Sequence, residues 1–150
     1  MATVTCSAAL PGVSAKQHPT GAITKYFTRA DVASLAAGDV VLCCKLPDRA
    51  MILDCAIRMG HRADTQATAN VFLAKSGDGS ASAIASMGTQ VLSATGGAQM
   101  FRPSTAWVPT RISLSDDAAV QHALLKVSVQ AGTTTTSFSL AGYILYSMDD

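Results

Sequence analysis

Four cysteines and three histidines are the side chains of this sequence best suited to bind a metal ion. Structural zinc sites hold such residues in closely spaced pairs, and the sequence has neither a C-x-x-C pair nor histidines at ligand spacing. A cupin-type metal site would need an H-x-H pair, which the sequence also lacks. We therefore expect no metal and no other cofactor. The residues considered are Cys6, Cys43, Cys44, Cys55, His18, His61 and His122.

A cysteine nucleophile needs a neighbouring group that stabilises its thiolate. Lys45 lies next to the pair Cys43–Cys44 and is the single such neighbour in the local sequence. We interpret the cysteines as reduced, buried, small apolar residues. Because adjacent residues of a strand point to opposite faces, Cys43 and Cys44 are not both expected in the core. The one on the wetter face should then react first with a thiol reagent.

Acid–base catalysis needs two carboxylates with separated pKa values in one cleft. All ten acidic residues are Asp, and most of them occupy turn-like segments or the C-terminus. Asp54 is an exception on the polar face of an expected strand, where we expect it to pair with an Arg or Lys. The sequence contains neither a G-x-S-x-G elbow nor a phosphate-binding loop. These patterns predict a protein that is not an enzyme.

Composition excludes two further classes of partner. The charged fraction of 14% is well below the usual quarter or so, and the net charge is +1. The basic residues are scattered, whereas nucleic-acid binding leaves a basic stripe, so we expect no nucleic acid. No apolar run approaches the ~18–20 residues of a membrane span, and Pro11–Gly12 interrupts the N-terminal apolar stretch, so we expect no membrane and no signal peptide.

Apolar residues at every second position predict strands along most of the chain. Val40, Leu42, Cys44 and Leu46 are expected to share one face, and so are Met51, Leu53, Cys55, Ile57 and Met59. Further strands are expected at 23–28, 69–75, 108–114, 123–129 and 138–146, and a short helical turn at 31–37. The segment 81–93 fits either a short helix, near 81–88, or a strand. About eight strands at this spacing predict an all-β, antiparallel β-sandwich of jelly-roll type over residues 23–150.

Residues 1–22 are expected to form an extended N-terminal arm. Pro11, Gly12, Pro19 and Gly21 interrupt any regular element there. We expect the arm to become ordered on a neighbouring subunit. Its candidate contact residues are Val4, Leu10 and Val13. In the body of the domain, the candidates are Trp107 and Tyr143, because aromatic side chains are enriched at protein interfaces.

The segments 35–41 (LAAGDVV) and 45–54 (KLPDRAMILD), followed by 69–73, Asp78–Gly79 and 143–146, resemble a layout found in jelly-roll decoration (cement) proteins of tailed bacteriophages. The resemblance covers about residues 23–147. It implies a virion protein on the outer capsid surface, made in the host cytoplasm, that bridges subunits of the major capsid protein. Sister copies forming a homodimer or homotrimer are the other partners expected, and the resemblance supplies no catalytic residues.

Two other function classes stay open from the residues. A carbohydrate- or receptor-binding jelly roll would need an aromatic platform, for which Trp107 with Tyr26, Tyr143 or Tyr146 are candidates. A cupin-like enzyme is disfavoured by the missing H-x-H pair.

We predict that deleting residues 1–20 leaves the melting temperature of the isolated domain nearly unchanged. A segment with four breakers and no sustained period buries too little surface to offset its ordering. The same deletion should weaken attachment to the capsid or to sister copies, as measured by occupancy on particles. A loss of several kcal/mol in the isolated domain, or unchanged occupancy, would contradict this.

Overall fold

The computed structural model describes residues 3–5, 16–17, 21–32, 35–60, 67–75, 83–92, 98–114, 122–132 and 138–148, which contain strands and no helix. Eleven strands are assigned in these ranges. They are β1 (Thr3–Thr5), β2 (Lys16–Gln17), β3 (Ala22–Val32), β4 (Val40–Pro47), β5 (Ala50–Gly60), β6 (Ala67–Lys75), β7 (Ala83–Leu92), β8 (Ala98–Phe101), β9 (Thr110–Arg111), β10 (His122–Ala131) and β11 (Phe138–Met148).

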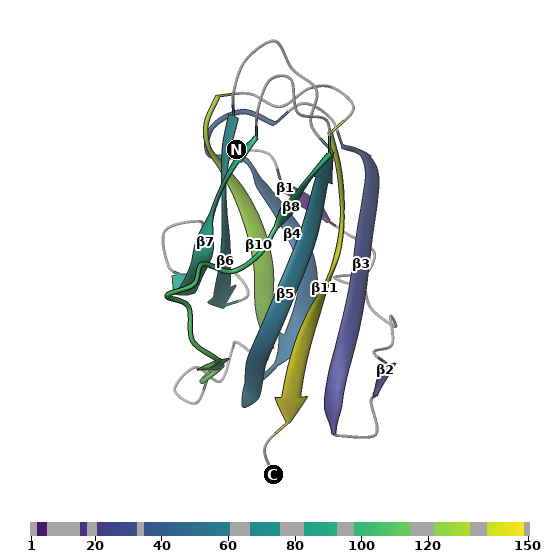
Figure 1. Ribbon diagram of the computed structural model, residues 1–150, viewed down its shortest axis with the longest axis vertical. Helices are drawn as coiled ribbons and strands as arrows, with labels where there is room; N and C mark the ends of the chain where they lie inside the picture. The colour runs from purple at the N-terminus through teal and green to yellow at the C-terminus, as the bar shows by residue number, and fades with distance from the viewer. Residues whose placement is uncertain are drawn as a thin grey trace.

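The strands form two sheets that face each other (Figure 1). The first, called sheet A here, has the order β1-β4-β10-β6-β7, and the second, sheet B, has the order β2-β3-β11-β5-β8, with β9 also paired to β5. Of the eight longer strands, consecutive ones pass from one sheet to the other at every connection except that between β6 and β7. This alternation is the jelly roll, so the predicted all-β jelly-roll sandwich is confirmed.

Most of the predicted strands are present, and the helical turn predicted at 31–37 is not found in the residues described there. In the segment 31–37, β3 continues to Val32, and Ala36 to Asp39 form a tight turn in which the Asp39 N–H donates to the Ala36 carbonyl (3.0 Å). The Asp39 carboxylate also accepts from the Ala36 N–H at 2.9 Å. In the undecided segment 81–93, Ala83–Leu92 form the strand β7, whose backbone pairs with β6. The Pro109 segment forms only the two-residue β9, paired to the rim of β5.

β-Bulges overturn part of the predicted side-chain alternation. Where β4 pairs with β10, Leu125 lies opposite Cys44 and Lys126 opposite Leu42, so Cys43 is an extra residue. An extra residue shifts the phase of the strand, so Cys43 and Cys44 are both fully buried. The expectation that only one of the two thiols faces the core is wrong for this reason.

A second β-bulge occurs in β5. Leu145 of β11 lies opposite Asp54 and Tyr146 opposite Ile52, which leaves Leu53 as the extra residue. Ile52 is therefore buried in the core, whereas Leu53 is only partly buried. The prediction that alternate residues of β5 share the core face is therefore confirmed after the bulge, for Cys55, Ile57 and Met59. It is wrong before the bulge, where Met51 and Leu53 are only partly buried.

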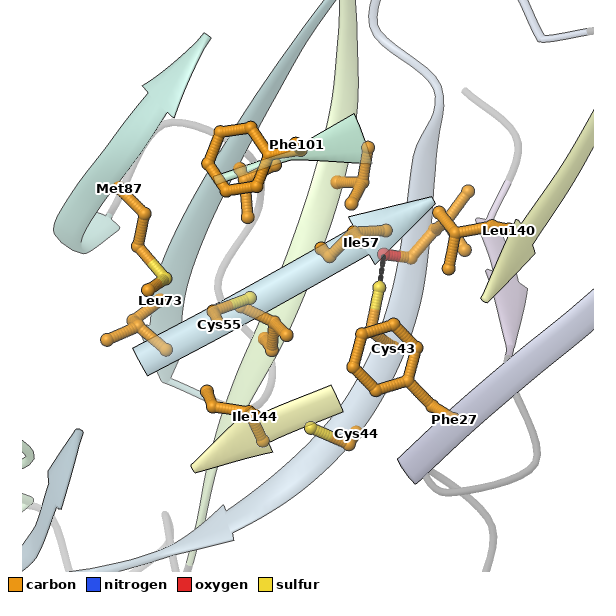
Figure 2. Close-up of a cluster of buried hydrophobic side chains, with 14 of the residues drawn as sticks. Phe27, Cys43, Cys44, Cys55, Ile57, Leu73, Met87, Phe101, Leu140 and Ile144 are labelled. Carbon is orange, nitrogen blue, oxygen red and sulfur yellow. Dashed lines mark hydrogen bonds between the residues drawn. The ribbon is translucent and has the colours of Figure 1, made fainter. Parts of the chain in front are cut away.

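The inner faces of the two sheets enclose one apolar core. Cys43, Cys44 and Cys55 lie in it together with aromatic and aliphatic side chains from both sheets (Figure 2). Phe27 and Phe101 supply phenyl rings to it, and both are at most 3% exposed. A fully buried side chain of this kind contributes about 1.5–3 kcal/mol, so this shared layer dominates the stability of the sandwich.

The outer faces of the two sheets differ. In sheet A, the outward-pointing residues Phe72, Leu124, Lys126 and Ser128 are all at most 6% exposed. In sheet B, Tyr26 and Met100 point outward and are 56% and 55% exposed. An open face of a sheet usually carries polar side chains, so exposed aromatic and sulfur-containing residues distinguish sheet B.

The N-terminal segments 3–5 and 16–17 extend the two sheets. Thr3 to Thr5 pair in parallel with Val40 to Leu42, and Lys16–Gln17 pair with Ile23 and Thr24. These pairings are short beside the 8 to 11 residues of β3, β4 and β5. Whether residues 1–22 behave as a separate arm stays a prediction for the deletion experiment.

Gly142 permits the close approach of β11 to β5. A Cβ atom built on Gly142 would overlap the carbonyl oxygen of Ala56 and would lie 2.9 Å from Cα of Ile57. Both of these atoms belong to the backbone, so they cannot move aside as a flexible side chain would. The two central strands of sheet B therefore require glycine at this position.

We predict that Gly142→Ala lowers the free energy of unfolding by about 1–3 kcal/mol, because it forces the two strands apart. Ala141→Ser is the matched control, since Ala141 is the adjacent residue of the same strand and is exposed. Urea unfolding of both variants measures the difference. Equal stability of the two variants would contradict the steric argument.

Candidate functional site

The outer face of sheet B brings together polar and aromatic side chains from four segments of the chain. Tyr26 on β3 lies directly opposite Tyr143 on β11, and Tyr143 lies opposite Ala56 on β5. Asp54 is two residues before Ala56 and so shares its face. Arg102 follows the end of β8, the strand that pairs with β5 on its other side. We call Tyr26, Asp54, Arg102 and Tyr143 the outer-face cluster.

Hydrogen bonds connect three members of the outer-face cluster. Nη1 of Arg102 donates to the Tyr143 hydroxyl at 3.0 Å and to Oδ2 of Asp54 at 3.2 Å. The Tyr143 hydroxyl donates to the same Oδ2 at 3.3 Å. The guanidinium carbon of Arg102 also lies 5.9 Å from the centre of the Tyr143 ring, within the range of a cation–π contact. These contacts fix the relative positions of the three side chains.

The fourth member extends the cluster by an aromatic contact. The rings of Tyr26 and Tyr143 have centres 6.3 Å apart and planes inclined by 60°, a favourable tilted geometry. Ala56 lies beneath this group and is only 3% exposed although it points outward. The cluster therefore forms a continuous layer over the middle of sheet B.

The charges of the outer-face cluster compensate each other. The hydrogen bond with Tyr143, and then the charges of Tyr143 and Asp54, raise the pKa of Arg102. Arg102 thus stays a cation beside the Asp54 carboxylate. The Asp54 and Arg102 side chains are 40% and 57% exposed, so this ion pair is well solvated and contributes little to stability. The main effect of this ion pair is to orient the exposed polar groups of the cluster.

The structure assigns different surroundings to the candidate contact residues. Tyr143 is a member of the outer-face cluster, and Asp54 has the expected arginine partner. Trp107 lies between β8 and β9 and packs against the core, and its buried indole N–H has no hydrogen-bond partner among the described residues. The neighbouring Val108 is 68% exposed. The described contacts of Tyr143 are with Tyr26, Arg102 and Asp54.

The proposed arm residues are described only in part. Val4 belongs to β1, where its backbone lies beside that of Val41. Leu10 and Val13 lie outside the described residues. Their role as contact residues stays a prediction.

Two members of the cluster had little or no sequence signal. Arg102 precedes a proline in a segment without periodicity, so nothing in the local sequence placed it beside Asp54. Tyr26 was noted only as one of several tyrosines for a sugar platform. Tyr146, another of those tyrosines, is 5% exposed and belongs to the core. Tyr143 and Tyr146 are three residues apart on β11, so simple alternation points Tyr143 outward and Tyr146 inward.

The environment of the Cys55 thiol disfavours its thiolate form. Burial, and then the neighbouring Cys44 and Asp54, raise the pKa of Cys55 far above its ordinary value. The thiol of Cys43 contacts the carbonyl oxygen of Val41 at 3.9 Å (Figure 2). A raised pKa reduces the thiolate fraction on which nucleophilicity depends. These cysteines act as core residues.

The remaining titratable candidates offer no metal site in the described ranges. Among those residues, no group of three His, Cys, Asp or Glu side chains could hold a metal ion. His122 begins β10, and burial, and then Lys45 and Lys25, lower its pKa. The described part of the chain also holds no helix that is long and apolar enough to cross a membrane.

Comparison with known proteins shows similarity at the level of the fold. No protein-family model matches the sequence, and no curated protein is significantly similar to it. A chain in the capsid of Ralstonia phage GP4 has a TM-score of 0.69 and 15% identity, and the match covers 99% of this chain and 99% of that one. A chain in the capsid asymmetric unit of cyanophage Pam1 has a TM-score of 0.51 and 18% identity, covering 93% of this chain and 100% of that one. This protein shares its fold with chains of phage capsids.

We predict that the free energy of unfolding falls as the pH rises above 9.0, the ordinary pKa of the Cys55 thiol. The unfolded thiol ionises there while the buried one keeps its proton, so deprotonation favours the unfolded state. One such group contributes at most about 1.4 kcal/mol per pH unit. Urea unfolding between pH 7 and 10.5 measures the slope.

Cys55→Ser provides the comparison for this pH dependence. The variant is less stable at neutral pH, but its stability should decline less steeply above pH 9.0. Tyr146, whose pKa burial also raises, stays in both proteins and so cancels in the comparison. Parallel pH profiles would show that Cys55 does not cause the decline.

Proposed function

We propose that this protein is a non-enzymatic structural protein of a bacteriophage virion. The observation that carries the proposal is the full-length fold similarity to a chain in the capsid of Ralstonia phage GP4, which covers 99% of both chains. The TM-score of 0.69 shows that the two chains share the sandwich fold. Within the virion, we propose the role of a decoration or cement protein on the outer surface of the major capsid protein shell.

The chemistry of the described residues supports a structural role. The carboxylate of Asp54 is engaged by Arg102 and Tyr143, and Cys55 is buried with a raised pKa. The raised pKa of Cys55 keeps its thiol protonated and weakly nucleophilic at neutral pH. In the proposed structural role, Cys55 serves core packing and Asp54 serves the organisation of the surface.

Attachment would use apolar and uncharged polar surface. A specific protein interface buries on the order of 1,600 Å², and its core is depleted of charged residues. The low charged fraction of 14% suits such contacts. We propose that residues 1–22 and the loop with Trp107 and Val108 contact the shell or sister copies. Val108 is an exposed apolar residue of this loop, at 68%.

The test is cryo-electron microscopy of heads assembled with and without the protein. We expect added density on the outer surface of the shell when the protein is present, in contact with the major capsid protein. We also expect heads without it to release their DNA at a lower temperature, because bridging contacts between shell subunits are missing. Density inside the shell, at the tail, or at no position would contradict the proposal.

Val108→Asp gives a point-mutation test of the attachment loop. The substitution places a charge on an exposed position, so the isolated domain should keep its melting temperature. Occupancy on heads should fall, because an unpaired carboxylate would be buried at the contact. Thr28→Asp on β3 is the matched control, since it adds the same charge at another exposed position. Equal occupancy of the two variants would remove this loop from the interface.

A further inference from the structure

We propose that the outer-face cluster of sheet B is a binding site for a neutral saccharide. The site consists of Tyr26, Tyr143, Arg102 and Asp54. This inference does not depend on the proposed capsid role, because all four residues belong to one chain. Three features of the cluster support it: an exposed aromatic ring, a fixed pair of polar groups with unused hydrogen-bonding capacity, and internal charge compensation.

The aromatic ring supplies an apolar platform. Tyr26 is 56% exposed, and on the same face of β3 it lies between Thr24, which is buried, and Thr28, which is exposed, as is Ala141 opposite Thr28 on β11. A pyranose ring has an apolar face of C–H groups, and an open aromatic ring can cover such a face. The tilted contact with Tyr143 limits the movement of the Tyr26 ring, which lowers the entropic cost of binding.

The polar pair supplies directional hydrogen bonds. In the residues that the structure describes, the cluster uses Oδ2 of Asp54 and Nη1 of Arg102 for its internal contacts. Oδ1 of Asp54 and the Nη2 and Nε groups of Arg102 are then available, in side chains that are 40% and 57% exposed. A planar acceptor beside a planar donor matches two neighbouring hydroxyl groups of a sugar.

The adjacent charges of Asp54 and Arg102 favour an uncharged ligand. Asp54 lies 3.2 Å from Arg102, so an anionic ligand at Arg102 would meet the carboxylate and a cationic one would meet the guanidinium. A protein partner would have to remove this ion pair from water, which carries a large desolvation cost. A neutral saccharide leaves the pair partly hydrated and offers hydroxyl groups to both ions. The cluster therefore fits a neutral saccharide better than a charged ligand or a protein.

The dimensions agree with a small ligand. The ring centres of Tyr26 and Tyr143 are 6.3 Å apart, and the guanidinium carbon of Arg102 lies over the Tyr143 ring, 5.9 Å from its centre. Neighbouring members of the cluster are thus in contact, as a site for a small ligand requires. An open site of this size predicts weak binding to single sugars and a gain in avidity when several copies act together.

The test is a two-dimensional NMR titration of the intact protein. The probes are the methyl glycosides of glucose, galactose, mannose and N-acetylglucosamine, with sialyllactose as an anionic comparison. We expect at least one neutral glycoside to shift resonances of β3, β5 and β11 around the cluster, and sialyllactose to bind no better than its neutral part. Absence of shifts with all four neutral glycosides, or a preference for the anionic probe, would overturn the proposal.

Variants locate the binding on the cluster. Tyr26→Ala and Asp54→Asn should each weaken binding of the responsive glycoside about tenfold, and Arg102→Gln should do the same. Val108→Ala is the control, because it removes exposed apolar surface outside the cluster. Melting temperatures establish that each variant is folded. Unchanged binding by Tyr26→Ala and Asp54→Asn would refute the assignment.

Particle occupancy separates this proposal from the capsid role. If Tyr26→Ala abolishes saccharide binding and keeps full occupancy on heads, the cluster is a saccharide site distinct from the attachment surface. If no glycoside binds and Tyr26→Ala detaches the protein from heads, the cluster is a protein contact and the saccharide proposal is wrong. Failure of head attachment by the wild-type protein would count against the capsid role alone.

Discussion

The fold depends on one constraint: two sheets must bury their inner faces against a single shared apolar layer. Jelly-roll connections cross between the sheets, so nearly every pair of consecutive strands contributes to both walls of that layer. Burial of each large side chain contributes about 1.5–3 kcal/mol, whereas the solvated Asp54–Arg102 pair contributes little. The sandwich is thus held together from within, and the exposed outer face of sheet B is available for contacts with other molecules.

The central strands of sheet B connect the core to the surface cluster. Gly142 lets β11 lie close to β5, and this fixes Tyr143 beside Ala56 and within reach of Asp54 and Arg102. A displacement of β11 would alter the core and the cluster together. The rigid sheet therefore supplies the preorganisation that flexible loops would lack.

A structural role in a virion and saccharide binding on the same domain are physically compatible. Attachment is proposed through the arm and the Val108 loop, and the cluster lies on the outer face of sheet B. Charge compensation in the cluster makes the site selective for neutral ligands, while the low charge of the chain favours contacts with protein. The two proposals use different residues, so each can fail without the other.

Period-2 alternation by itself determined the fold class and most strands, because apolar side chains at every second position suit a half-buried sheet. Asp54 was also recognised as a polar residue needing a cation. Only the tertiary structure decided where alternation changes phase. The bulges at Cys43 and Leu53 depend on partners in β10 and β11, which are distant in sequence. The outer-face cluster could not be predicted from the sequence for the same reason. Arg102 is 48 residues from Asp54 and 41 residues from Tyr143 along the chain, and local sequence patterns do not indicate contacts over such distances.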